Sequence, residues 1–154
     1  MEFRKADIID RDALVEMRML YLADDIGSIA PNIEKQIKEQ LPDYFERHLN
    51  RDLFVYIAED GEKAVSCCML IVTEKPANTR FPHGLTGSVL NVYTRQEYRR
   101  QGLAGKLMHM LINDAVELGL DLIELKATSD GIKLYKSLGF DQDFSKYTEM
   151  KLVL

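Results

Sequence analysis

The stretch Tyr98–Leu107, YRRQGLAGKL, joins a strand-like segment to a helix-like segment. Residues 88–94 (SVLNVYT) before it are rich in β-formers, and apolar residues recur at helical spacing from Leu107 onward. A strand therefore leads into a helix whose first turn contains glycine and alanine, and small side chains let a ligand approach the backbone closely. The first N–H groups of a helix lack partners within it, and the helix dipole favours negative charge there. The stretch predicts an anion site, with phosphate as the natural ligand.

Length and charge restrict the function further. The chain has 154 residues, with 20 Lys+Arg against 25 Asp+Glu and a net charge of −5. That length suits one domain over residues 1–154. An acidic protein is a poor general nucleic-acid binder, so no nucleic-acid partner is expected. The basic residues near the turn form a local patch that suits a small anionic ligand: Arg95, Arg99, Arg100 and Lys106.

The two cysteines are adjacent, Cys67-Cys68. In a strand they point to opposite faces, so a bond between them is not expected, and a metal site would lack a second pair. We expect buried, reduced apolar residues, with a functional free thiol as the alternative. The N-terminus is charged from the outset, and no apolar run approaches the roughly 20 residues of a membrane helix. A soluble, cytoplasmic protein without a membrane partner is expected.

The remaining patterns predict alternating strands and helices. Strands are expected over 2–6, 53–58, 63–73, 88–94 and 121–128, with a final strand in the alternating tail around 150–154. Helices are expected from an Asp10 cap to about Ala23, from an Asn32 cap onward with Pro42 as a kink or a new start, from the glycine turn to Gly119, and over 132–138. The Asp-Gly turn at 59–62 indicates a hairpin, and residues 74–87 a long loop.

Two nucleotide-binding motifs fit the turn poorly. A P-loop requires Ser or Thr after Gly-Lys, but Leu107 follows Lys106. A dinucleotide fingerprint requires three glycines in an opening βαβ unit, and here only Gly102 and Gly105 occur, late in the chain. Another anionic ligand is therefore favoured.

A two-part pattern fits better. Arg99-x-x-Gly102-x-Ala104 follows a strand, and LYKSLGF at 134–140 lies downstream of the next strand. Together they resemble the GNAT superfamily of acyl-CoA-dependent N-acetyltransferases, with its Arg/Gln-x-x-Gly-x-Gly/Ala signature and its Leu-Tyr-x-x-x-Gly-Phe helix end. The resemblance implies an α/β fold with a mixed, mostly antiparallel seven-stranded sheet flanked by helices, in the order β-α-α-β-β-β-α-β-α-β-β.

The resemblance implies acetyl-CoA as co-substrate and no metal. Its pantetheine arm would lie between two separating strands, against the backbone of Val92, Tyr93 and Thr94. Its pyrophosphate would lie at the turn, with these residues in contact: Arg99, Arg100, Gln101, Gly102, Leu103, Ala104, Gly105 and Lys106. Ser129 occupies a region where family members often carry a polar residue that reaches CoA, typically Asn, although its simplest role is to cap a helix.

By the same resemblance Tyr135 is the general acid. A phenol is protonated at neutral pH and can donate a proton to a departing thiolate; core packing is the alternative role. A base must also keep the amine neutral. Glu124 is a candidate on the strand before Tyr135, with a solvated strand residue as an equal alternative, and Glu97 and His83 compete with it.

These expectations combine into one activity. An acetyl group would move from acetyl-CoA to a primary amine of a small molecule by direct attack in a ternary complex. A protein or peptide amine is one alternative acceptor, and a non-catalytic acyl-CoA-binding regulatory module is a rival function. The first 50 residues and the loop 74–87 would form the acceptor site. The sequence leaves the oligomeric state open, with a homodimer through the C-terminal strand as one alternative.

Overall fold

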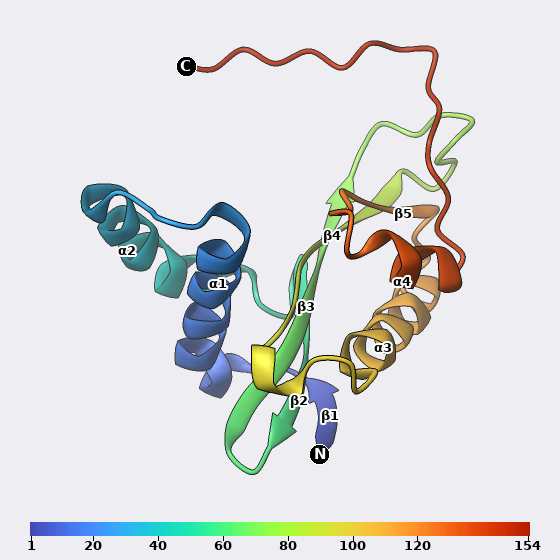
Figure 1. Cartoon of the computed structure of the whole chain (residues 1–154). Coiled ribbons are helices and arrows are strands. Elements are labelled where there is room, and N and C mark those ends of the chain that lie inside the picture. The colour runs from blue at the N-terminus through green and yellow to red at the C-terminus, as the bar shows by residue number, and fades with distance from the viewer.

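The computed structural model describes residues 1–154 and contains a five-stranded sheet with helices on both faces (Figure 1). The strands are β1 (Glu2–Lys5), β2 (Leu53–Asp60), β3 (Lys63–Glu74), β4 (Leu85–Thr94) and β5 (Leu122–Leu125). They lie in the order β1-β2-β3-β4-β5. All neighbours are antiparallel except β4 and β5, which run parallel. The mixed, mostly antiparallel sheet between helices confirms the predicted fold class.

The helices divide between the two faces of the sheet. They are α1 (Arg11–Ile26), α2 (Pro31–His48), α3 (Leu103–Glu117) and α4 (Ile132–Ser137). Helices α1 and α2 cover one face with one core cluster, and α3 packs a second cluster on the other face, where α4 also lies (Figure 1). None of the helices combines the length and apolar character needed to cross a membrane.

The two cysteines mark the division of the core. Cys67 belongs to the cluster under α1 and α2, and Cys68 to the cluster under α3, as the two-residue period of a strand requires. Both are fully buried and free. Burial raises the pKa of Cys67 to about 12 and that of Cys68 well above its ordinary value. Both thiols therefore stay protonated and act as apolar core residues.

The hairpin between β2 and β3 forms where the Asp-Gly turn predicted it, with Gly61 at φ 63°. The segment between β3 and β4 is shorter than the expected loop, because β4 already begins at Leu85. Strand β5 is shorter than expected and ends at Leu125. The core strands thus follow the predicted order, with different ends.

The predicted final strand is wrong. Residues 141–154 form no helix or strand, and the chain extends from α4 away from the sheet (Figure 1). Phe144, Tyr147, Met150 and Leu152 in it are all exposed. Alternating side chains favour an extended backbone, but a strand also requires a neighbour for its N–H and C=O groups. The sheet therefore has five strands where seven were expected.

The two predicted helix caps have different outcomes. Asp10 occupies the N-cap position of α1 as predicted, but its side chain makes no capping hydrogen bond there. It accepts instead from the N–H of Asp7, whose own side chain caps a short 3₁₀ turn. The predicted Asn32 cap is wrong. Helix α2 begins with Pro31 at its first position, where the missing N–H costs nothing, and Asn32 is already inside it. The helix then passes through Pro42 without ending.

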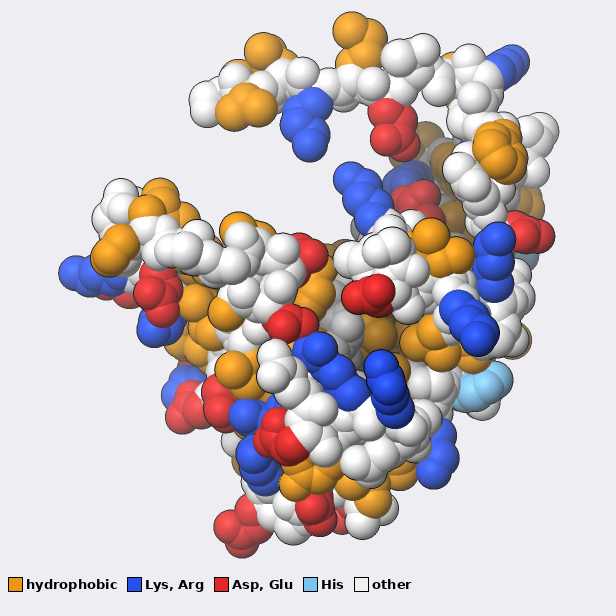
Figure 2. Space-filling view, viewed as in Figure 1, with side chains coloured by type: hydrophobic (Ala, Val, Ile, Leu, Met, Phe, Trp, Pro, Cys, Tyr) orange, Lys and Arg blue, Asp and Glu red, His pale blue; other side chains and the backbone are white.

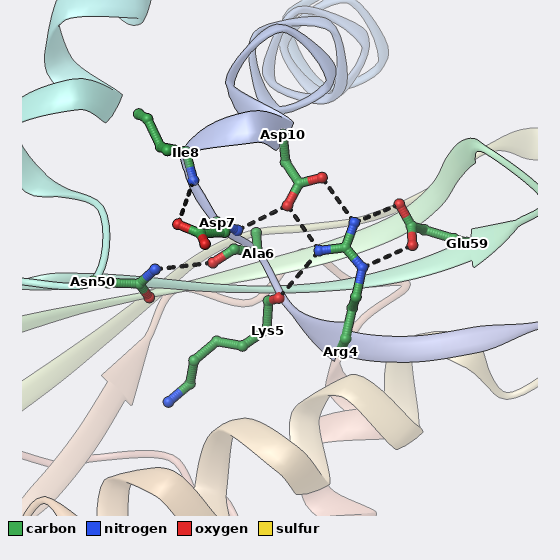
Figure 3. A network of polar contacts seen from close by, with 8 residues as sticks. All are labelled: Arg4, Lys5, Ala6, Asp7, Ile8, Asp10, Asn50 and Glu59. Carbon is green, nitrogen blue, oxygen red and sulfur yellow. Dashed lines mark hydrogen bonds and ion pairs between the residues drawn. The ribbon is translucent and has the colours of Figure 1, made fainter.

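A buried polar network ties β1 to β2 and to the start of α1 (Figure 3). The guanidinium of Arg4 donates to both carboxylate oxygens of Asp10 and to both of Glu59, each at 2.8 Å. All three side chains are largely enclosed. The hydrogen bonds from Arg4 hold the pKa of Asp10 below its usual range. Removing Arg4 would leave two carboxylates facing each other without a cation.

We expect Arg4→Gln to lower the free energy of unfolding by about 2 kcal/mol, because charged hydrogen bonds are lost at a partly buried site. The lowered pKa of Asp10 gives stability that is present above its unfolded pKa of about 3.9 and is lost as the pH falls through the folded pKa. The difference in stability between the wild type and the variant should therefore shrink as the pH falls through the folded pKa of Asp10. Denaturant unfolding across a pH series measures both effects. Arg47→Gln, which breaks the exposed pair with Asp43, should change little.

Candidate active site

Strands β4 and β5 pair over only part of the length of β4. They pair from Thr86 with Leu122 to Val89 with Leu125, and β5 then ends while β4 continues to Thr94. The backbone of residues 90–94 therefore has no strand on its β5 side. The separation of these two strands, expected from the resemblance, is present. Val92, Tyr93 and Thr94 lie on this unpaired edge.

A β-bulge sits at the same place. Between the pairs Cys67 with Tyr93 and Met69 with Leu90, β4 carries one more residue than β3. Asn91 and Val92 of β4 oppose the single residue Cys68 of β3. Asn91 has a left-handed φ of 53° and is buried. Its Nδ2 donates to Cys67 Sγ at 3.2 Å, and its Oδ1 accepts from Arg18 Nη1 at 3.2 Å. Asn tolerates this conformation better than most residues, which was the one local signal for it.

The turn between β4 and α3 has the geometry of a backbone anion cradle. Arg100 and Gly102 have left-handed φ values of 62° and 74°, and α3 begins at Leu103 with no side-chain cap. The N–H groups of residues 100–105 donate to no acceptor in the protein. Successive free N–H groups at the positive end of a 15-residue helix suit a phosphate.

The basic residues around this turn differ in what they contact. Arg99 pairs with Asp24 at the end of α1 at 2.7 Å and donates to the carbonyl of Thr94, so its charge is neutralised. Lys106 lies over the ring of Phe3, and Arg100 is exposed and free of ion pairs. Figure 2 shows Lys and Arg side chains gathered near the turn, beside a recess between the α1 side and the α4 side of the molecule.

Tyr135 lies on α4, half-buried, with its ring edge-on to Phe140 at 6.0 Å. Its hydroxyl makes no hydrogen bond within the protein. Burial raises the pKa of Tyr135, with smaller contributions from Tyr21 and Cys68, so the phenol stays protonated at neutral pH. Gly131 makes room for the ring, because a Cβ there would lie 2.7 Å from its Cε2. Sequence reasoning missed this role of Gly131.

The fold brings the two sequence motifs together. A Cβ on Gly105, in the first turn of α3, would lie 3.6 Å from Leu134 Cδ1 on α4. Tyr135 and Val92 also pack against the same core cluster as Leu103. The start of α3, the unpaired edge of β4 and the ring of Tyr135 therefore border the same core cluster.

The candidate bases do not all reach this region. Glu124 is exposed on β5, beside Ser88 and without a hydrogen-bonding partner in the protein. His83 bonds Asp121 at 2.6 Å near the start of β4, at the opposite end of that strand from the cradle. Glu97 pairs with Lys63 at 3.2 Å. No one of these side chains is placed as an evident base.

Ser129 is exposed in the segment between β5 and α4. The predicted capping role is wrong, because α4 has Gly131 at its N-cap position and no side-chain cap. The carbonyl of Thr128 instead accepts from the N–H groups of Gly131 and Ile132. No group of three or more His, Cys, Asp or Glu side chains is arranged to hold a metal ion.

Comparison with known proteins agrees with this geometry. Residues 17–140 match the model of the acetyltransferase (GNAT) family. The chain belongs to this family. A predicted acetyltransferase from Clostridium acetobutylicum, crystallised with acetyl-CoA, is 32% identical over 97% of this chain and 95% of its own, with a TM-score of 0.85. The resemblance inferred from the two motifs is thereby confirmed, and acyl transfer is the chemistry of the family.

Two acetyltransferase structures of lower sequence identity share the fold. A GCN5-related N-acetyltransferase from Ralstonia eutropha JMP134 is 21% identical over 97% of both chains, with a TM-score of 0.78. Glucosamine-6-phosphate N-acetyltransferase from Arabidopsis thaliana is 14% identical over 97% of both chains, with a TM-score of 0.69. A sequence search of curated proteins found no match.

Proposed function

We propose that this GNAT protein transfers an acetyl group from acetyl-CoA to a primary amine of a small molecule. The observation that carries the proposal is the meeting of three features in one region: free N–H groups at the start of α3, an unpaired β4 edge, and a tyrosine hydroxyl without a partner. Each suits one part of the reaction. The co-crystallised relative from Clostridium acetobutylicum supports acetyl-CoA as the donor.

The residues present fit acetyl-CoA. The N–H groups of residues 100–105 would hold the pyrophosphate, with Arg100 and Lys106 adding positive potential. The backbone of Val92, Tyr93 and Thr94 would bind the pantetheine arm. The carbonyl of Thr94 already accepts from Arg99, so N–H groups are the better remaining contacts at that end.

The chemistry then needs one proton donor. The neutral amine attacks the thioester carbonyl, a C–N bond forms, and the C–S bond breaks with its electron pair on sulfur. The phenol of Tyr135 gives its proton to that thiolate, and the amine loses a proton to water or to a base such as Glu124. The products are an amide and CoA with a free thiol.

A thermal-shift titration tests donor binding first. Acetyl-CoA at about 100 times its Kd should stabilise the protein by about 2.7 kcal/mol. A panel of primary amines with a thiol reagent then tests transfer. Donor binding without release of thiol for any small amine or peptide would overturn the enzymatic proposal. An absent thermal shift at saturating acetyl-CoA would overturn donor binding itself.

A further inference from the structure

Arg18 on α1 carries a charge that no carboxylate of the protein neutralises. The other partly enclosed arginines, Arg4, Arg11 and Arg95, each pair with an Asp or Glu. Arg51 also lacks an ion pair, but it is exposed, whereas Arg18 is half-buried. A cation withdrawn from water without a counter-charge is costly. An anion that arrives from outside would offset that cost.

Most hydrogen-bond donors of Arg18 are free. Its Nη1 donates to Asn91 Oδ1 at 3.2 Å, and its guanidinium lies 5.5 Å from the centre of the Tyr21 ring. A guanidinium has five N–H donors in a planar fork, which matches two oxygens of a carboxylate or phosphate. The contact with Asn91 also fixes where the side chain points.

Arg18 lines a hollow between α1 and α2. The hollow has a volume of about 460 Å³, and its other lining residues are Leu22, Gln36, Ile37, Gln40 and Leu41. It contains no acidic side chain that would compete for the guanidinium. Through Asn91 the hollow adjoins the bulge of β4, and Tyr21 on the same helix as Arg18 influences the pKa of Tyr135. The hollow therefore borders the region of the proposed acetyl transfer.

We propose that Arg18 binds an anionic group of the acceptor, so that the substrate is an amine that also carries a carboxylate or a phosphate. The inference rests on the proposed function, because it assigns the acceptor side of the same site. The apolar residues of the hollow would contact the carbon chain between the two groups. Arg18 thus selects the substrate and takes no part in proton transfer.

Matched pairs of amines test this. One pair is a small amino carboxylate and its carboxamide, and the other is ethanolamine phosphate and ethanolamine. The anionic member of a pair should have kcat/KM at least about tenfold higher, as a charged hydrogen bond would give. Arg18→Gln should remove that preference chiefly through KM, Arg18→Lys should keep part of it, and Arg51→Gln should change nothing. The two pairs distinguish carboxylate from phosphate.

Equal use of both members of each pair by the wild type, or an unchanged preference in Arg18→Gln, would overturn the inference. Calorimetric binding of the same probes to the protein saturated with CoA gives a readout without turnover. Anion-selective, Arg18-dependent binding there supports the inference even when no amine is acetylated, whereas absent turnover overturns the proposed function alone. Equal binding of the anionic and the neutral member of each pair would also overturn the role of Arg18.

Discussion

Tyr135→Phe is expected to lower kcat at least about a hundredfold while leaving the affinity for acetyl-CoA unchanged. A positioned general acid contributes roughly a hundredfold to ten-thousandfold, and Phe keeps the ring that packs against Phe140 while removing the proton. Steady-state kinetics with the best amine of the panel measure kcat, and a thermal-shift titration measures acetyl-CoA binding. Tyr147→Phe, in the exposed tail, is the matched control.

The proposed role of Tyr135 also predicts how kcat depends on pH. Only the protonated phenol can donate, so kcat should fall as the pH rises through the pKa of Tyr135. Because burial raises that pKa, the fall should come above the usual value of about 10. Tyr135→Phe should lose this basic limb. An unchanged kcat in Tyr135→Phe would show that another group protonates the thiolate.

A substitution at Gly131 offers a second test of the role of Tyr135. Its φ of −84° suits any amino acid, so Gly131→Ala introduces no backbone strain. The added Cβ, at 2.7 Å from Tyr135 Cε2, should displace the ring and lower kcat while the hydroxyl remains present. Full activity in Gly131→Ala would show that the exact position of the ring is unimportant.

Local patterns predicted the parts of the fold that local physics determines. The hairpin formed where the sequence places Gly61, which takes the left-handed φ that the turn requires. The adjacent cysteines took opposite faces because a strand alternates. The glycine turn before α3 formed for a similar reason, since Gly102 occupies a left-handed position there. These features depend on neighbours along the chain.

The errors arose where distant contacts decide the structure. Asp10 resembles a helix cap, but Arg4 and the N–H of Asp7 use its carboxylate. For Pro42 the sequence allowed a kink or a new segment; the new segment is excluded because α2 continues through Pro42, with Leu41 and Phe45 on either side buried in the core. The tail has a strand pattern without a strand, since no neighbour within the chain pairs with it.

The sequence predicted only those residues of the candidate site that belong to short local motifs. Sequence motifs located the turn and Tyr135, whose family pattern is short and local. No such pattern marks Arg18, Asn91 or Gly131. Arg18 and Asn91 matter because a hydrogen bond between them joins α1 to β4. Gly131 matters because it lies against the ring of Tyr135, one helical turn away. Only the three-dimensional arrangement could identify them.

Gly105→Glu is expected to weaken acetyl-CoA binding about a hundredfold without loss of stability. Glu is favoured over Gly in a helix, and its charge suits the first turn of α3, so folding should be unharmed or improved. A Cβ there meets only Leu134 Cδ1, at 3.6 Å. The carboxylate would instead repel a pyrophosphate bound at the same N–H groups. At about 5 Å and an effective dielectric constant of about 20, two unit charges repel by about 3 kcal/mol.

Isothermal titration with CoA measures the loss, and matched variants separate its causes. Gly105→Gln has the same size without the charge, so it isolates the steric part. Asn113→Asp adds the same charge near the other end of α3 and should leave the affinity nearly unchanged. If the N–H groups at the start of α3 hold the pyrophosphate, the affinity should fall far more in Gly105→Glu than in Gly105→Gln, and added salt should reduce the difference. Equal affinities in these two variants would place the pyrophosphate elsewhere, because a charge within the cradle cannot be neutral toward an anion bound there.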